Sequence, residues 1–130
     1  MMATPIPAPT SPARVILVDD DPAVTRAIEF SFGLEGLQVS AFPDAAHLLD
    51  SPGLSEAGCL ILDYQLPDMD GLHLLARLRE DGVTAPAILI TSNPKRVLRQ
   101  QAAEAGAPII EKPLLSDALL DSVKRALGTA

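Results

Sequence analysis

Aromatic residues, cysteine and basic residues are all scarce in this chain of 130 residues. Tryptophan is absent, aromatic residues make up 3% of the sequence, and Cys59 is the only cysteine. One cysteine cannot form an internal disulfide framework, and no Cys/His cluster has the spacing of zinc ligands. We therefore expect Cys59 to be a reduced core residue of a cytoplasmic protein.

Positive charge and long apolar runs are also in short supply. Ten Lys and Arg stand against 17 Asp and Glu, which gives a formal net charge of −7. Binding of nucleic acid by this chain alone is not expected, because such affinity comes mainly from basic side chains that neutralise phosphates. No apolar run is long enough to span a membrane, and residues 1–13 lack the basic and apolar regions of a secretory signal. That segment is rich in proline, which predicts a disordered tail before a single domain at residues 14–127.

Short apolar runs alternate regularly with longer stretches of helical periodicity. Continuous apolar runs are typical of parallel strands buried on both faces. Strands are expected at residues 15–18, 37–42, 59–62, 87–90 and 108–110, with the second at an edge because it alternates in polarity. Helices are expected at residues 22–35, 45–49, 71–80, 94–105 and 116–127, with Pro22 and Pro94 in first-turn positions. The pattern predicts an α/β fold, a (βα)5 doubly wound sheet of five parallel strands.

Polar residues follow several of the expected strands, at the edge where an open parallel sheet binds its ligand. Asp19 and Asp20 follow the first strand, Asp63 the third, Thr91 the fourth and Lys112 closely follows the fifth. Carboxylates brought together there repel each other by a few kcal/mol per pair, at an effective dielectric near ~20, and Mg²⁺ is the cation best suited to neutralise them. Since a lysine and a hydroxyl can hold phosphoryl oxygens, Asp63 is a candidate nucleophile for phosphoryl transfer.

Four segments resemble the receiver domain of two-component response regulators. They are ILVDDDP at 16–22, LDYQLPDMDG at 62–71, ITS at 90–92 and EKP at 111–113. They occur in the family's order, each at the end of its own strand, and the resemblance extends over about residues 14–127. It implies the flavodoxin-like strand order 2-1-3-4-5.

The resemblance also implies roles for the acidic residues. Asp63 would accept the phosphoryl group and, with Asp20, bind Mg²⁺ directly, whereas Asp19 would hold the metal largely through water. The backbone carbonyl of Gln65 would be a further metal ligand. The side chains of Gln65 and Asn93 would tune dephosphorylation.

Two residues would contact the phosphoryl group itself. Thr91 would bind and report it, and Lys112 would pair with it, with a cis peptide bond between Lys112 and Pro113. The sequence departs from the family nearby. Ile109 stands where the family usually has Phe or Tyr, so the aromatic switch is missing, and Leu114 stands where Phe commonly follows the Lys-Pro pair. The stretch 106–111 also looks about one residue shorter than usual.

The resemblance implies a response regulator that takes a phosphoryl group from a histidine kinase or a histidine phosphotransfer protein. It would act by contact with a protein target through its fourth helix, fifth strand and fifth helix, or by phosphorelay, and it allows a homodimer. Such a protein would catalyse only its own phosphorylation and dephosphorylation. Residues 128–130 directly follow the last helix, which predicts either a protein without an output domain or a receiver excised from a longer regulator.

Two other functions are considered. One is a receiver-like interaction module that works without phosphorylation, motivated by Ile109 and the short 106–111 stretch. The other, a distant third, is a phosphatase of the haloacid dehalogenase type, but Ala23 stands where that motif needs Thr or Val, and the chain has no room for a cap domain.

Several remaining residues have ordinary structural interpretations. We expect Asp21 to cap the first helix and residues 68–71 to form a turn that caps the third. Tyr64 is expected to pack, and His47 and His73 to lie at or near the surface. The basic residues of the fourth helix are expected to form a solvated face, or alternatively a docking patch for an acidic partner: Lys95, Arg96 and Arg99.

Overall fold

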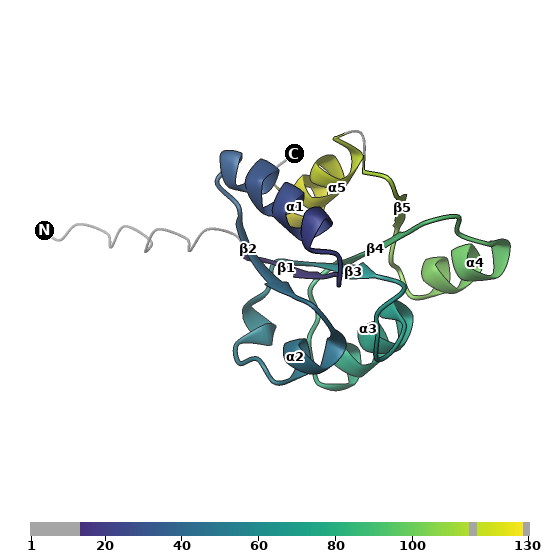
Figure 1. Cartoon of the computed structure of the whole chain (residues 1–130). Helices are drawn as coiled ribbons and strands as arrows, with labels where there is room; N and C mark the ends of the chain where they lie inside the picture. Colours follow the sequence, from purple (N-terminus) through teal and green to yellow (C-terminus); the bar gives the residue numbers. More distant parts are fainter. Residues whose placement is uncertain (1–13, 115–116, 129–130) are drawn as a thin grey trace, which may run out of the picture.

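The computed structural model describes residues 14–114 and 117–128 (Figure 1). Its centre is a sheet of five parallel strands in the order β2-β1-β3-β4-β5, which confirms the predicted fold and places the second strand at an edge. The strands are β1 Arg14–Val18, β2 Gln38–Phe42, β3 Cys59–Asp63, β4 Ala87–Thr91 and β5 Ile109–Glu111. The predicted tail at residues 1–13 lies outside the described residues.

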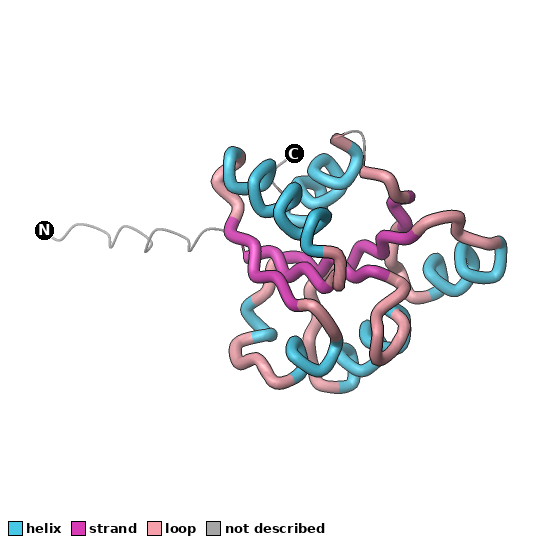
Figure 2. Tube along the Cα trace, viewed as in Figure 1, coloured by secondary structure: helices cyan, strands magenta, loops and turns pink. Residues whose placement is uncertain are grey.

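Helices cover both faces of the sheet, as Figures 1 and 2 show: α1 and α5 on one face, α2 and α3 on the other, with α4 beside the β5 edge. The bounds are α1 Pro22–Leu34, α2 Ala45–Leu49, α3 Gly71–Glu80, α4 Arg96–Glu104 and α5 Ala118–Leu127, and a single 3-10 turn occupies Leu54–Glu56. Within the described part of the chain, no helix is long and apolar enough to cross a lipid bilayer.

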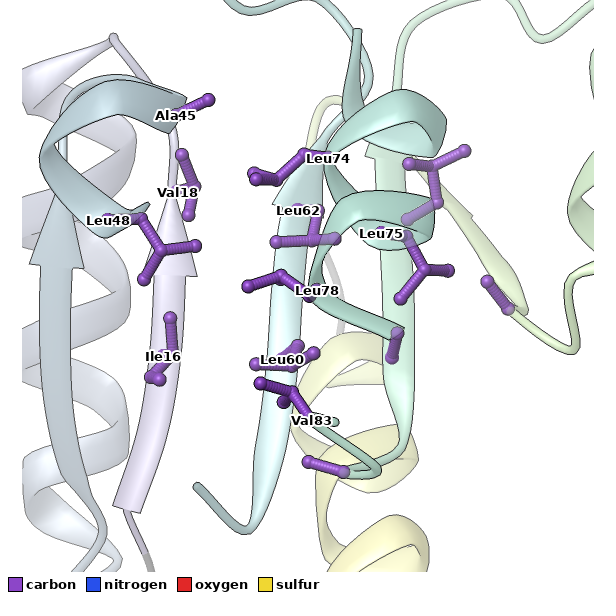
Figure 3. Packing of buried hydrophobic residues seen from close by; sticks show 14 of the residues in the cluster. Ile16, Val18, Ala45, Leu48, Leu60, Leu62, Leu74, Leu75, Leu78 and Val83 are labelled. Atoms are coloured by element: carbon purple, nitrogen blue, oxygen red, sulfur yellow. The ribbon is translucent and has the colours of Figure 1, made fainter. Parts of the chain in front are cut away.

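Alternate strand residues supply a core on each face of the sheet, because successive side chains of a strand point in opposite directions. Ile16, Leu60 and Leu62 pack with Leu48 of α2 and Leu74 of α3 (Figure 3). The other face packs against α1 and α5 through Val15, Leu17, Ile61, Ile28, Phe32, Leu119 and Val123. The three central strands are buried on both sides, so their polar side chains are confined to their ends.

The ends of several elements differ from the sequence prediction. The prediction placed Pro94 in the first turn of the fourth helix, but α4 begins at Arg96. Asn93 has a left-handed backbone (φ +47°) and Lys95 is extended, so the chain turns before it becomes helical. The predicted start of the fifth helix at Ser116 lies outside the described residues. β3 and β4 each continue through one polar residue, because Asp63 and Thr91 still align with residues of the neighbouring strand.

Candidate functional site

The strand ends bring an acidic cluster together at one edge of the sheet. The carboxylates of Asp19, Asp20 and Asp63 each offer an oxygen within 4.8 Å of the others. Asp19 and Asp63 are buried, with 3% and 4% of their surface exposed, whereas Asp20 is exposed. The cluster forms because Asp19 and Asp20 follow β1 directly and Asp63 ends the adjacent strand β3.

Lys112 lies between the two buried acids. Its Nζ is 3.0 Å from Oδ2 of Asp19 and 3.0 Å from Oδ2 of Asp63. Lys112 directly follows β5, its peptide bond to Pro113 is cis as predicted, and its backbone N–H donates to the Thr91 carbonyl at 2.8 Å. Burial alone would lower the pKa of Lys112, but the two carboxylates together raise it, so the ammonium remains charged.

Opposing interactions act on the pKa of the Asp63 carboxylate. Burial raises its pKa most strongly and the charge of Asp19 raises it further, whereas the hydrogen bond from Lys112 lowers it, with a net rise. Its Oδ2 accepts from Lys112, and its Oδ1 accepts from the backbone N–H of Gln65 at 3.2 Å. Both oxygens are thereby oriented, as a nucleophilic carboxylate requires.

The residues present fit a divalent cation. The carboxylates of Asp19 and Asp63 share one ammonium and that of Asp20 lies close to both, while the buried Oδ2 of Asp19 accepts no hydrogen bond although Lys112 lies 3.0 Å from it. A hard cation with oxygen ligands supplies the missing charge. Of the predicted ligands, Asp19, Asp20 and Asp63 lie together, and Gln65 lines the cleft beside them. Beside them lies a cleft of about 330 Å³, lined by Asp20, Asp21, Asp63, Gln65, Leu66, Pro67, Ser92 and Lys112.

The other predicted site residues lie nearby, but not all of them face this cleft. Thr91 ends β4 and is buried, and its hydroxyl is directed to the Ser92 carbonyl at 3.4 Å. Ser92 rather than Thr91 lines the cleft in this conformation, and Asn93 is exposed. Ile109 is half-buried and packs against the core beneath α3 and α4, three residues before Lys112. Ser92 is a lining residue that the sequence did not single out, and its place next to Thr91 was the available signal.

Gly71 supports the site in a way that the sequence did not reveal. A Cβ atom at this position would lie 2.5 Å from the backbone oxygen of Asp63 and 2.9 Å from Cδ1 of Leu89. The first turn of α3 therefore packs directly on the strand end that carries Asp63. The Gly71 N–H also donates to the Tyr64 carbonyl at 2.8 Å, which closes the loop between β3 and α3.

Two aspartates of that loop cap different helices. Asp70 caps α3 as predicted, by accepting from the backbone N–H of His73 at 2.8 Å. Asp68, in the same predicted turn, has a second role that the prediction did not include. Its two oxygens accept from the N–H groups of Ala45 and Ala46, at 3.1 and 2.9 Å, at the start of α2. Asp68 thus joins two helices that are separated in the sequence.

The remaining sequence predictions concern a helix cap, the tyrosine, the two histidines and the basic residues near α4. Asp21 caps α1 by accepting from the Ala23 N–H at 2.9 Å, and Tyr64 packs against the core, both as predicted. His47 and His73 are exposed, and each ring contacts the capping aspartate of its own helix at 2.6 Å. Arg99, one of the three basic residues predicted to form a solvated face, makes an ion pair with Glu111 of β5 at 2.5 Å. Its charge is therefore paired within the protein.

Comparison with known proteins agrees with this geometry. Residues 15–124 match the family described as the response regulator receiver domain. The chain is 41% identical over 115 residues to the C4-dicarboxylate transport transcriptional regulatory protein DctD of Pseudomonas aeruginosa, covering 88% of this chain and 25% of that protein. It is 32% identical to the transcriptional regulatory protein FixJ of Bradyrhizobium diazoefficiens, covering 93% of this chain and 60% of that protein. The chain therefore spans a quarter to about three fifths of these relatives.

Solved structures give the same result. A CheY-like response regulator receiver domain protein from Methanospirillum hungatei superimposes with a TM-score of 0.81 at 26% identity, covering 91% of this chain and 95% of that one. The response regulator StyR gives 0.80 at 30% identity, covering 91% of this chain and 60% of that one. The strand order, the acidic cluster with its lysine, and these likenesses lead to one conclusion: the chain belongs to the response regulator receiver domain family.

Proposed function

We propose that this domain accepts a phosphoryl group from a phosphohistidine donor onto Asp63, with Mg²⁺ bound at the acidic cluster. The observation that carries the proposal is the position of Lys112, whose Nζ lies 3.0 Å from the carboxylates of both Asp63 and Asp19. A single ammonium held between a nucleophile and a second acid can pair with a phosphoryl oxygen that arrives on Asp63.

In the proposed transfer, an oxygen of Asp63 forms a bond to phosphorus while the P–N bond of the donor breaks. The electron pair of that bond returns to the imidazole nitrogen of the donor histidine. Lys112 neutralises charge on the transferring group, and the Gln65 N–H holds the attacking carboxylate in place. Asp19, Asp20, Asp63 and the Gln65 carbonyl would hold Mg²⁺, which would supply positive charge to the phosphoryl oxygens.

Loss of the phosphoryl group is proposed to be slow. Water must attack phosphorus near the exposed Gln65 and Asn93, whose neutral amides cannot act as strong general bases. We expect positioning of water alone, and a phosphoryl lifetime of minutes or longer. The only catalysis in this proposal is that of the domain's own phosphorylation and dephosphorylation.

The proposed output is a phosphorylation-dependent protein contact or a phosphorelay. The face formed by α4, β5 and α5 carries the exposed Val97 and the Arg99–Glu111 ion pair, and β5 leads directly into Lys112. This continuity from the site to the surface supports output through that face. A homodimer formed through the same surface is one version of such a contact.

The test is the intact mass of the protein after incubation with acetyl phosphate. We expect addition of one phosphoryl group in the presence of Mg²⁺, none after chelation, and none for Asp63→Asn. Asp81→Asn is the matched control, because it makes the same substitution on an exposed side chain at the C-terminal end of α3. This variant should be labelled like the parent. Equal labelling of Asp63→Asn, or labelling that ignores chelation, would overturn the proposal.

Ile109 motivates one alternative function, a module that works without phosphorylation. A module that binds its partner without phosphorylation would need no aromatic switch, and Ile109 at that position is half-buried. Binding of the target to the labelled and to the unlabelled protein separates the two, because such a module would bind its target equally well with or without a phosphoryl group on Asp63.

A further inference from the structure

The first turn of α2 is capped by residues from two different parts of the chain. Asp44, directly before the helix, accepts from the His47 N–H at 2.7 Å. The N–H groups of Ala45 and Ala46 donate instead to the two oxygens of Asp68 at 3.1 and 2.9 Å. Asp68 lies in the loop between β3 and α3, so α2 and this loop share one set of charge-assisted hydrogen bonds.

Hydrogen bonds hold the two ends of that loop, and part of its middle is exposed to solvent. At one end the Gln65 N–H donates to Asp63 at 3.2 Å, and Gln65 pairs with Asp70 in an antiparallel bridge. At the other end Gly71 donates to the Tyr64 carbonyl at 2.8 Å. Between them, Pro67 and Asp68 are exposed to solvent. Leu66 and Met69, on either side, pack against the core, and the hydrogen bonds of Asp68 to α2 tie the exposed part of this segment to the body of the protein.

We propose that Asp68 is a positioning residue for the metal site. By holding the middle of the loop against α2, it restricts the backbone of Gln65, whose carbonyl is expected to bind Mg²⁺. This inference rests on the proposed function. Its physical basis is that groups which orient a metal ligand lower the conformational freedom of that ligand before the metal arrives.

Asp44 offers a matched control within the same helix. Asp44→Ala and Asp68→Ala both remove capping of the first turn of α2, but only Asp68→Ala releases the loop. Loop order is measured without metal, by amide hydrogen exchange of residues 65, 66, 68 and 69. We expect faster exchange in Asp68→Ala and parental exchange in Asp44→Ala.

Metal affinity is measured on the same variants by Mg²⁺ titration, followed through the ¹³C shift of the Gln65 carbonyl. Loss of a residue that orients a metal ligand typically weakens binding about tenfold or more, so we expect the midpoint for Asp68→Ala to rise by about that factor. Asp44→Ala should keep the parental midpoint. Asp68→Asn retains one acceptor oxygen and should give an intermediate midpoint, and it serves as the test variant if Asp68→Ala does not fold.

The outcomes are distinguishable. Equal exchange rates and equal midpoints in the Asp44 and Asp68 variants would overturn the positioning role while leaving the proposed function intact. A parental protein whose Gln65 carbonyl shift does not respond to Mg²⁺ would count against the proposed function and against the metal part of this inference. The exchange measurement would still decide whether Asp68 orders the loop.

Discussion

Replacing Asp63 with asparagine should stabilise the metal-free protein, although Asp63 is the proposed phospho-acceptor. Its carboxylate lies within 4.8 Å of oxygens of Asp19 and Asp20. At an effective dielectric near 20, each of these pairs at that distance repels by about 3.5 kcal/mol. The ammonium of Lys112, 3.0 Å away, attracts Asp63 by about 5.5 kcal/mol on the same basis.

The two repulsions exceed the attraction by about 1.5 kcal/mol, and burial of the Asp63 charge adds to the imbalance. Water around the exposed Asp20 screens its share and works in the opposite direction. We therefore expect Asp63→Asn to raise the free energy of unfolding at neutral pH by roughly 1–2 kcal/mol.

The pH dependence has a definite sign. The pKa of Asp63 is raised in the folded protein, chiefly by burial, so the folded state binds this proton more tightly than the unfolded chain does. The stability contributed by the protonated group is fully present below the unfolded pKa and is lost as the pH rises through the folded pKa. The advantage of Asp63→Asn over the parent should accordingly shrink in acid and be fully developed at neutral pH.

Urea unfolding with a chelator present measures this difference. The control is Asp50→Asn, which changes an exposed acid at the end of α2 and should alter stability by at most a few tenths of a kcal/mol. Mg²⁺ at ~100 times its dissociation constant should stabilise the parent by about 2.7 kcal/mol and Asp63→Asn by much less. A metal-free Asp63→Asn protein that is no more stable than the parent would refute the charge argument.

Three further predictions concern the surroundings of the site. Gly71→Ala should cost roughly 1–3 kcal/mol of stability and slow acetyl phosphate labelling, because its Cβ would meet the backbone oxygen of Asp63 at 2.5 Å; parental stability in urea would contradict this. Burial raises the pKa of Cys59 to about 11, so the stability linked to its neutral thiol is lost as the pH rises from 9 towards 11. In unfolding titrations over that interval, the free energy of unfolding of Cys59→Ala should fall by up to about 2.7 kcal/mol less than that of the parent. Beryllofluoride with Mg²⁺ should shift the amide resonances of residues 91–99 strongly and the Ile109 methyls little, because Ile109 is expected to stay packed in both states; an Ile109 rotamer change as large as the loop response would rule this out.

The convergence of the site could be predicted from the sequence because it depends on topology alone. Once the apolar runs are recognised as parallel strands, Asp19, Asp63 and Lys112 must meet at one sheet edge, whatever the details of packing. The strand positions were predictable because the apolar runs are continuous and polar residues follow them. The edge position of residues 38–42 followed from their alternating polarity.

Contacts between loops and distant helices could not be predicted in this way. Asp68 lies two residues before the cap of α3, and local spacing assigns it to that helix, whereas its partners Ala45 and Ala46 are more than twenty residues away. The start of α4 was misplaced because Pro94 is a good first-turn residue in isolation. The left-handed backbone of Asn93 and the extended Lys95 decide the boundary, and both are set by the tertiary path of the loop.

The same charge imbalance underlies both the predicted instability of the metal-free site and its proposed affinity for a cation. The strands beneath it are buried on both faces and fix the positions of Asp19 and Asp63, so the carboxylates cannot separate to relieve their repulsion. One ammonium, 3.0 Å from an oxygen of each, compensates only part of the charge. A cation that enters the cluster removes a repulsion that the fold has already imposed, and its binding free energy includes that relief. On the proposed function, a substitution that relieves this repulsion should therefore raise the stability of the metal-free domain and lower its affinity for Mg²⁺.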